Sequence, residues 1–206
     1  MEERVVEQCG NTAKPHTVWD DYVPQITKGH HTDVYLHDSI EAPAEYTKVY
    51  AALLNADRHD TFTIHINNGG GFVDSGFMLI NAIKASKAHV EASITGTVAS
   101  ISTIIALSCD RITVGDHLSW LSHNYSGGVQ GKGGEIKSQM EFMSRELASS
   151  FKEVHEGFFT TEEIEAIIND EDIWLSSSEV RERLIAKEDA NLVLLEEIAA
   201  KRKDKR

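Results

Sequence analysis

One serine, Ser100, stands where an expected strand turns into an expected apolar helix, within the segment 96–101, Gly-Thr-Val-Ala-Ser-Ile. A serine at the N-terminus of a helix is usually a cap. Here the small residues that precede it would let the backbone of a substrate lie against its hydroxyl. A helix N-terminus also favours negative charge that develops beside it. Ser100 is therefore a candidate nucleophile, with a helix cap as the alternative.

A histidine, His123, follows the apolar stretch 118–122 and precedes a polar Asn-Tyr-Ser-Gly-Gly segment, which places its ring at the end of an expected strand. If His123 is a general base, it needs a carboxylate to orient it. By spacing alone, four aspartates qualify: Asp110, Asp116, Asp170 and Asp172. The neighbouring His30 and His31 lack a third ligand at metal spacing, so no metal site is predicted.

A glycine-rich run, Asn67-Asn68-Gly69-Gly70-Gly71, follows the alternating segment 62–66. Glycine permits positive φ and lets backbone N–H groups approach a ligand closely, although a lone triple glycine is more often a tight turn. The dinucleotide and P-loop glycine patterns are both absent, and the nearest approach to a P-loop, around Lys132, lacks its first glycine and its final Ser or Thr. Binding of ATP through a P-loop is therefore not expected.

Composition limits the possible classes of protein. The 206 residues include 20 Lys and Arg against 33 Asp and Glu, a net charge of −13, which argues against a nucleic-acid binder. Two cysteines, Cys9 and Cys109, cannot form a disulfide framework. The N-terminus does not resemble a signal peptide, and the uncharged stretch 92–109 contains eight Ser, Thr or Gly residues, too many for a good membrane span. We expect one soluble domain in the cytoplasm, without membrane or nucleic-acid partners.

Strands and helices alternate along the first two thirds of the chain. Strands are expected at 33–37, 62–66, 90–95 and 111–114, and helices at 44–56, 73–85 and 99–108. This alternation predicts βαβ units around a mostly parallel sheet. Five glycines in 126–134 then precede a long helix over 135–156, which suggests an arm leaving the main body. A short helix at 161–168 and a last one from Ser177 complete the chain.

The serine, the histidine and an aspartate follow one another downstream of the glycine run, and in this order the chain resembles the proteolytic subunit of the Clp protease family (ClpP). The family motifs and their matches are N-S-P-G-G at 67–71, G-x-x-A-S at 96–100, M-I-H-Q-P at 121–125, G-G-x-Q-G at 127–131 and R-D-x-F-L-[ST] at 171–176. The resemblance covers about residues 5–186. Residues 5–8, Val-Val-Glu-Gln, also resemble the V-I-E-Q of the family's axial pore loop.

The resemblance implies a role for five residues. Ser100 is the nucleophile, His123 the general base and then acid, and Asp172 the residue that orients His123. Asp172 is preferred to Asp170 because only Asp172 occupies the motif position before x-aromatic-Leu. The backbone N–H groups of Gly71 and Ile101 form the oxyanion hole. No cofactor is implied.

The resemblance also implies an α/β, ClpP/crotonase-like spiral of βαβ units with a protruding strand-helix handle. The parts of this single domain, 1–206, are an N-terminal axial-loop segment (1–32), the handle (126–159) and a charged C-terminal tail (187–206). Two heptameric rings stack into a tetradecamer, a serine endopeptidase that hydrolyses unfolded polypeptides inside its barrel. ATP is used only by a separate AAA+ unfoldase of the Clp type.

Departures from the family motifs keep two alternatives open. Gly69 replaces the family proline, Asn124 and Tyr125 replace Gln-Pro, and the interval from serine to histidine is two residues shorter than usual. Residues 109–112, Cys-Asp-Arg-Ile, resemble the wider crotonase superfamily, so an acyl-CoA enzyme is one alternative. A non-catalytic scaffold or regulatory ring subunit is the other.

Substitutions at partner-facing positions lead to two further expectations. Thr63 and His65 stand where the family has exposed tyrosines that help bind the unfoldase, so the partner is expected to be atypical. Glu171 replaces the family arginine before the catalytic aspartate, and Lys132 stands where the handle commonly has glutamine. An inverted ion pair between Lys132 and Glu171 of facing rings is one interpretation, and two unrelated surface substitutions are the other.

Overall fold

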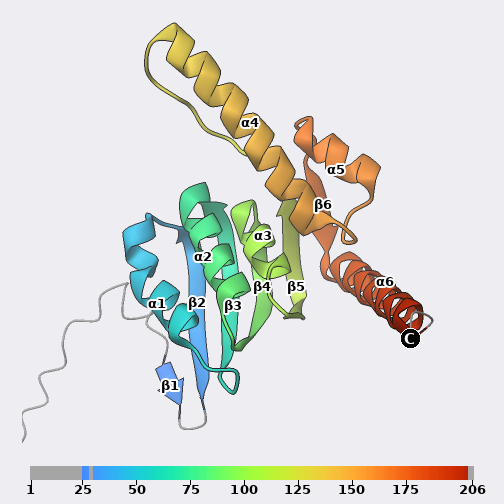
Figure 1. Cartoon of the computed structure of the whole chain (residues 1–206). Coiled ribbons are helices and arrows are strands. Elements are labelled where there is room, and N and C mark those ends of the chain that lie inside the picture. Colours follow the sequence, from blue (N-terminus) through green and yellow to red (C-terminus); the bar gives the residue numbers. More distant parts are fainter. Residues whose placement is uncertain (1–24, 28–29, 204–206) are drawn as a thin grey trace, which may run out of the picture.

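The computed structural model describes residues 25–27 and 30–203, which form one six-stranded sheet and a long helix that projects from it (Figure 1). The strands lie side by side in chain order. They are β1 (Gln25–Thr27), β2 (His31–Ile40), β3 (Thr61–Gly71), β4 (His89–Ala99), β5 (Arg111–Ser122) and β6 (Ile173–Ser176). Strands β2 to β5 are parallel, whereas β1 and β6 pair antiparallel at the two edges. The predicted α/β class is confirmed.

The helices closely match the sequence periodicity. They are a 3₁₀ turn η1 (Pro43–Tyr46), α1 (Thr47–Asn55), α2 (Val73–Ala85), α3 (Ile101–Leu107), α4 (Gly133–His155), α5 (Thr161–Ile168) and α6 (Ser177–Lys203). The bounds predicted for α2 and α5 are those observed. The segment from residue 187, expected as a charged tail, continues α6 as far as Lys203.

The strands differ more from expectation than the helices do. The glycine run is the end of β3 rather than a turn, and the two short apolar segments at 111–114 and 118–122 belong to one strand, β5. Strands β1 and β6 were not anticipated. The predicted axial-loop segment, 1–32, lies largely outside the described residues.

Helices α1, α2 and α3 cover one face of the sheet, and within the described residues these three helices leave the other face uncovered (Figure 1). Side chains along the strands alternate accordingly: in β3 Phe62, Ile64 and Ile66 are buried, while Thr63 and His65 between them are only half-buried. This is the period of two that a sheet with one covered face requires. Among the described residues, no helix is long and apolar enough to cross a membrane.

Helix α4 projects from the sheet, and residues 123–132 run toward its tip without regular secondary structure (Figure 1). The expected handle is therefore present, although its first segment forms no strand within the single chain. The base of α4 is anchored because Val154 and His155 are buried. Tyr125 adds a second attachment, since its hydroxyl lies 2.7 Å from the Ser144 hydroxyl of α4.

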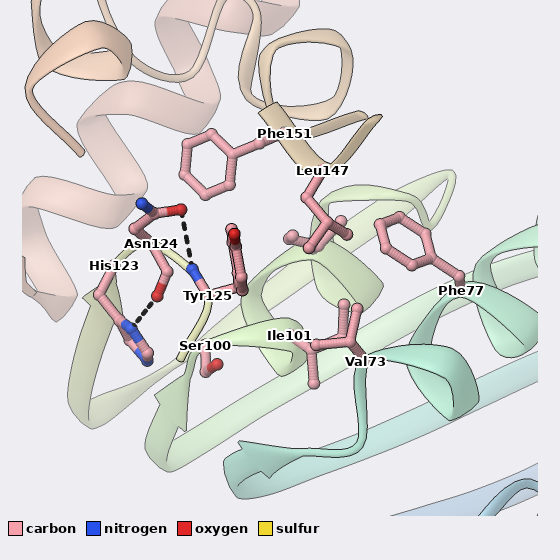
Figure 2. A pocket seen from close by; sticks show the side chains of 10 residues that line it. Val73, Phe77, Ser100, Ile101, His123, Asn124, Tyr125, Leu147 and Phe151 are labelled. Atoms are coloured by element: carbon pink, nitrogen blue, oxygen red, sulfur yellow. Dashed lines mark hydrogen bonds between the residues drawn. The ribbon is translucent and has the colours of Figure 1, made fainter. Parts of the chain in front are cut away.

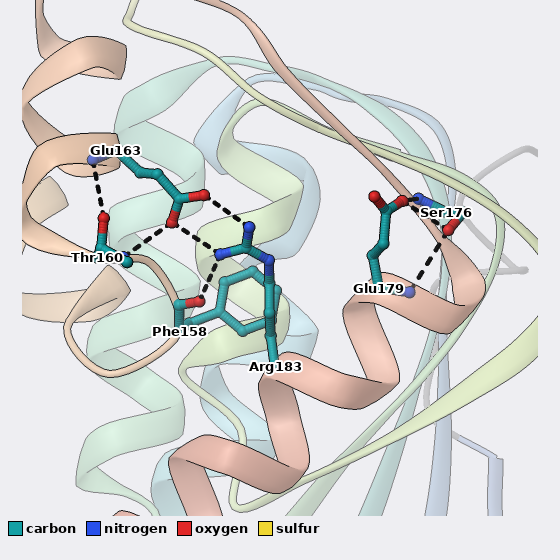
Figure 3. Close-up of polar contacts among 6 residues, drawn as sticks. All are labelled: Phe158, Thr160, Glu163, Ser176, Glu179 and Arg183. Atoms are coloured by element: carbon teal, nitrogen blue, oxygen red, sulfur yellow. Dashed lines mark hydrogen bonds and ion pairs between the residues drawn. The ribbon is translucent and has the colours of Figure 1, made fainter.

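Contacts of Arg183 fix α5 and the loop that precedes it to α6 (Figure 3). Arg183 of α6 donates to both carboxylate oxygens of Glu163, at 2.6 and 2.8 Å, and to the carbonyl of Phe158 at 3.2 Å. The hydrogen bonds from Arg183 lower the pKa of Glu163 below its usual value. Glu163 also completes a capping box with Thr160 at the start of α5. The handle therefore begins from a base attached at several points.

Candidate functional site

Ser100 forms a sharp elbow between β4 and α3. Its backbone has φ 57° and ψ −133°, and its side chain makes no capping hydrogen bond to α3. The conformation is held from both sides: the Ser100 N–H donates to Leu121 O at 3.0 Å, and the Ser100 carbonyl accepts from the N–H and hydroxyl of Thr103 at 3.0 and 2.6 Å. Non-glycine residues adopt positive φ only where their surroundings impose it, often at functional sites. Ser100 thus occupies the N-cap position of α3, but its hydroxyl does not cap the helix.

Two glycines of β3 bring backbone close to this elbow. A Cβ on Gly70, which has φ +95°, would lie 2.5 Å from the Cβ of Ser100. A Cβ on Gly71, which has φ +152°, would lie 2.2 Å from the carbonyl oxygen of Ile40. Only glycine fits at either position. The amide of Ile101, the other predicted oxyanion donor, is the first of α3 and has no acceptor within that helix.

Asn68, which the sequence analysis did not single out, holds the glycine segment in place. Its side-chain oxygen accepts from the N–H of Gly70 and the hydroxyl of Ser102, both at 2.8 Å, and its amide nitrogen donates to His37 O at 3.3 Å. The Gly70 amide is therefore already satisfied, which leaves the Gly71 amide as the candidate donor. A polar residue at a buried, inward position of β3 was the available signal.

Ser100 and His123 line the same pocket (Figure 2). The pocket has a volume of about 40 Å³, and its walls come from α2, α3, α4 and the segment after β5. Its remaining lining residues are Val73, Phe77, Ile101, Ile104, Asn124, Tyr125, Leu147 and Phe151. The pocket therefore combines a hydroxyl and an imidazole with mostly apolar walls.

The predicted triad is only partly assembled. His123 is half-buried, and its Nδ1 lies 2.5 Å from the carbonyl oxygen of Asn124. The described side chains of Ser100 and His123 share the pocket without a hydrogen bond between them. Asp172 is exposed and makes no side-chain hydrogen bond or ion pair with any described residue. The structure thus brings two of the three residues together and leaves the carboxylate outside the pocket.

The strand register nevertheless favours Asp172 over the other aspartates. Strands β5 and β6 pair antiparallel, and their last pair is Ser122 opposite Ile173. His123 directly follows this pair in β5, and Asp172 directly precedes it in β6. Asp172 therefore lies beside the same end of the strand pair as His123.

The other three aspartates are engaged elsewhere. Asp110 accepts from the N–H of Val90, beside the start of β4, and Asp116 forms an ion pair with Arg181 at 2.9 Å. Asp170 accepts from the side-chain amide of Asn124 at 2.8 Å, so it lies near the site but faces the residue after His123.

Lys132 and Glu171 lie at opposite ends of the handle. Lys132 precedes the first turn of α4, and Glu171 lies between α5 and β6 near the handle base. Both side chains are exposed, and no ion pair joins them within this chain. The inverted pair between facing rings stays a prediction. Among the described residues, no group of three or more His, Cys, Asp or Glu side chains could hold a metal ion.

The candidate site lies at the carboxyl ends of parallel strands, because Gly71 ends β3, Ser100 follows β4 and His123 follows β5. Ligands of open α/β sheets bind at this edge. The fold and pocket thus define a class, an α/β protein with a serine at a sharp strand-to-helix turn beside a pocket at this edge of its sheet.

The family follows from comparison with known proteins. Residues 17–188 match the family model for Clp protease. The chain is also 30% identical over 143 residues, 68% of its own length and 67% of the relative's, to "ATP-dependent Clp protease proteolytic subunit 2" of Treponema denticola. The chain belongs to the Clp protease family and is accordingly a peptidase. The predicted family is confirmed, and neither the acyl-CoA enzyme nor the scaffold is favoured.

Proposed function

We propose that this chain is the proteolytic subunit of an ATP-dependent Clp protease, a serine endopeptidase that hydrolyses unfolded polypeptides. The observation that carries the proposal is the convergence of Ser100, His123 and the end of β3 on one edge of the sheet. A nucleophile, a base beside it and nearby backbone amides are the parts that acyl transfer requires.

Each of these parts has a role in cleavage. His123 accepts the proton of Ser100 while Oγ attacks the substrate carbonyl carbon, and the N–H groups of Gly71 and Ile101 stabilise the oxyanion. The C–N bond then breaks, and His123 gives the proton to the leaving amine. Water attacks the acyl-enzyme with His123 again as base, which releases the second product and restores Ser100. Asp172 orients His123 and stabilises its charged form.

The apolar walls suggest which side chain precedes the cleaved bond. Phe77, Ile104, Leu147 and Phe151 line the pocket beside Ser100, and none of them carries a charge. A charged substrate side chain would lose its hydration there without gaining a partner. Peptides with an apolar residue before the cleaved bond should therefore be preferred.

Assembly and partners complete the proposal. Two heptameric rings would stack into a tetradecamer, and a separate AAA+ unfoldase would use the ATP.

On the uncovered sheet face, His65 pairs with Asp33 at 2.8 Å and stacks on Tyr35 at 4.8 Å between ring centroids. This surface is more polar than a row of tyrosines, which supports an atypical unfoldase. A cytoplasmic location stays a prediction from sequence.

Labelling with a fluorophosphonate probe tests the proposal directly. The assembled wild-type protein should gain one probe per chain, located on Ser100 by peptide mass spectrometry. Ser100→Ala should abolish labelling and peptide cleavage, whereas Ser178→Ala, which removes an exposed hydroxyl at the start of α6, should keep both. An assembled ring that neither reacts with the probe nor cleaves peptides would refute the enzyme and favour the scaffold.

A further inference from the structure

The side chain of Asn124 joins the strand end that carries His123 to the loop that carries Asp172. Its amide nitrogen donates to the Ile168 carbonyl at 3.0 Å and to the Asp170 carboxylate at 2.8 Å, while its oxygen accepts from the N–H of Tyr125 at 2.9 Å. Both amide hydrogens and one oxygen lone pair are thus used. The orientation of the amide is fixed, because exchanging its oxygen and nitrogen would place oxygen against two acceptors.

These bonds complete the C-terminus of α5. The N–H of Asp170 donates to Ile167 O at 3.1 Å and that of Glu171 to Ala166 O at 3.0 Å, the paired bonds of a Schellman motif. Asp170 occupies its left-handed position with φ 69°, where glycine is usual. The carboxylate of Asp170 is held by Asn124 from 46 residues away. Asn124 therefore caps α5 and helps to hold the start of the acid loop.

The position of this cap matters because the acid loop is short. Asp172 follows Asp170 by two residues and precedes the first residue of β6, while Asn124 directly follows His123. One side chain thus spans the two chain segments immediately beyond the last paired residues of β5 and β6, Ser122 and Ile173. A substitution at Asn124 should therefore change the distance between His123 and Asp172, although neither of these residues is itself replaced.

We propose that Asn124 is a positioning residue, which holds the loop of Asp172 beside His123 by capping α5 and binding Asp170. The inference rests on the proposed function, since it assigns Asn124 a role in the cleavage reaction. Asn124 itself need not contact the substrate's reacting atoms. Although Asn124 also lines the pocket, its loss should lower kcat more than it raises KM, because the apolar side chains of the other walls are unchanged.

Exchanging the amide of Asn124 and the carboxylate of Asp170 tests this role. Asn124→Asp removes both donors and sets two carboxylates against each other, so kcat should fall about tenfold or more. Asp170→Asn alone should stay within about twofold of wild type, because asparagine keeps an acceptor and tolerates the left-handed conformation. In the double exchange the new amide donates to the new carboxylate, and kcat should recover by at least about threefold over Asn124→Asp.

Two measurements separate positioning from a general loss of structure. Circular dichroism and ring assembly should be unchanged in the variants, with Asn124→Ala as a substitute if Asn124→Asp does not fold. Labelling of Ser100 in Asn124→Asp should be slower than in wild type but still reach one probe per chain, because every chain is folded while His123 is less well oriented. Asn124→Asp with kcat within twofold of wild type, or a double exchange no better than Asn124→Asp, would overturn the inference.

Failure of the inference can be told from failure of the proposed function. Wild-type protein that does not label on Ser100 would refute the serine endopeptidase itself. Wild-type protein that labels and cleaves, beside an Asn124→Asp variant that does both at the same rate, would refute only the positioning role.

Discussion

A buried histidine at the base of the handle should make stability depend on pH, and the perturbation that reveals it is His155→Phe. His155 is completely buried at the end of α4, stacked on Phe151 at 3.8 Å and on Phe159 at 5.5 Å between ring centroids. Its Nδ1–H donates to the Phe151 carbonyl at 2.9 Å, whereas its Nε2 has no partner within the described part of the chain. A cation, Lys187, lies nearby and donates to the carbonyl oxygen of Val154.

These surroundings favour neutral His155. Burial lowers the pKa of His155 from 6.5 to about 4, and the charge of Lys187 acts in the same direction against the hydrogen bond to Phe151. Because the folded pKa is below the unfolded one, the unfolded state binds more protons between these values, and stability falls as pH falls below 6.5. Between about pH 7.5 and pH 5 the free energy of unfolding should drop by about 2 kcal/mol.

The assay compares urea unfolding at these two pH values and one fixed protein concentration. Wild type should lose about 2 kcal/mol on acidification, equivalent to about 4–8 °C in Tm for a chain of this length. His155→Phe keeps a stacking ring but cannot be protonated, so it should lose much less. An exposed histidine outside this stack provides the control: His117→Gln should show the wild-type drop.

The outcome that would refute the reasoning concerns the change with pH and not absolute stability. Phenylalanine is larger than histidine and also gives up the bond to Phe151, so the variant can be more or less stable than wild type at both pH values. A drop of about 2 kcal/mol that persists in His155→Phe would show that His155 is not its source.

Two further predictions concern the proposed active site and ring contact. Asp172→Asn should keep the assembled protein intact while reducing kcat by orders of magnitude, whereas Asp170→Asn should stay near wild type; full activity of Asp172→Asn would identify the wrong acid. If Lys132 pairs with Glu171 of a facing ring, Lys132→Glu and Glu171→Lys should each weaken ring stacking in sedimentation at low salt, and the double exchange should restore it. Intact double rings in both single variants would exclude the pair, whose single copy is worth only about 0.2–1 kcal/mol.

The parts of the fold that sequence predicted well are those specified by neighbouring residues. Helix α5 was predicted from 161 to 168, as observed, and a local capping box between Thr160 and Glu163 defines its start. Strand β6 was not predicted, because it is only four residues long and its pairing partners in β5 lie about 50 residues earlier in the chain. Short apolar segments of this kind do not reveal their type by periodicity.

The same distinction applies to the site. The placement of Ser100 and His123 at one edge of the sheet could be predicted because each stands at the end of a recognisable strand, whereas only family motifs selected Asp172. No local pattern indicates that Asn124 binds Asp170, or that Asn68 holds Gly70 and Ser102, since most of these contacts join residues more than thirty positions apart. A buried polar side chain finds its partner only when the chain is folded.

The arrangement of these contacts divides the site into a fixed half and a half that depends on the handle. Ser100 is tied to the sheet through Leu121, whereas His123 stands at the start of the segment that leads into α4. Helix α4 also supplies Phe151, which forms a wall of the pocket and stacks on His155 one turn later. Any displacement at the handle base must therefore move a pocket wall, while Ser100 stays with the sheet. Acidification should affect substrate binding and stability through the same ring stack, whereas substitution of Asn124 should act mainly on kcat.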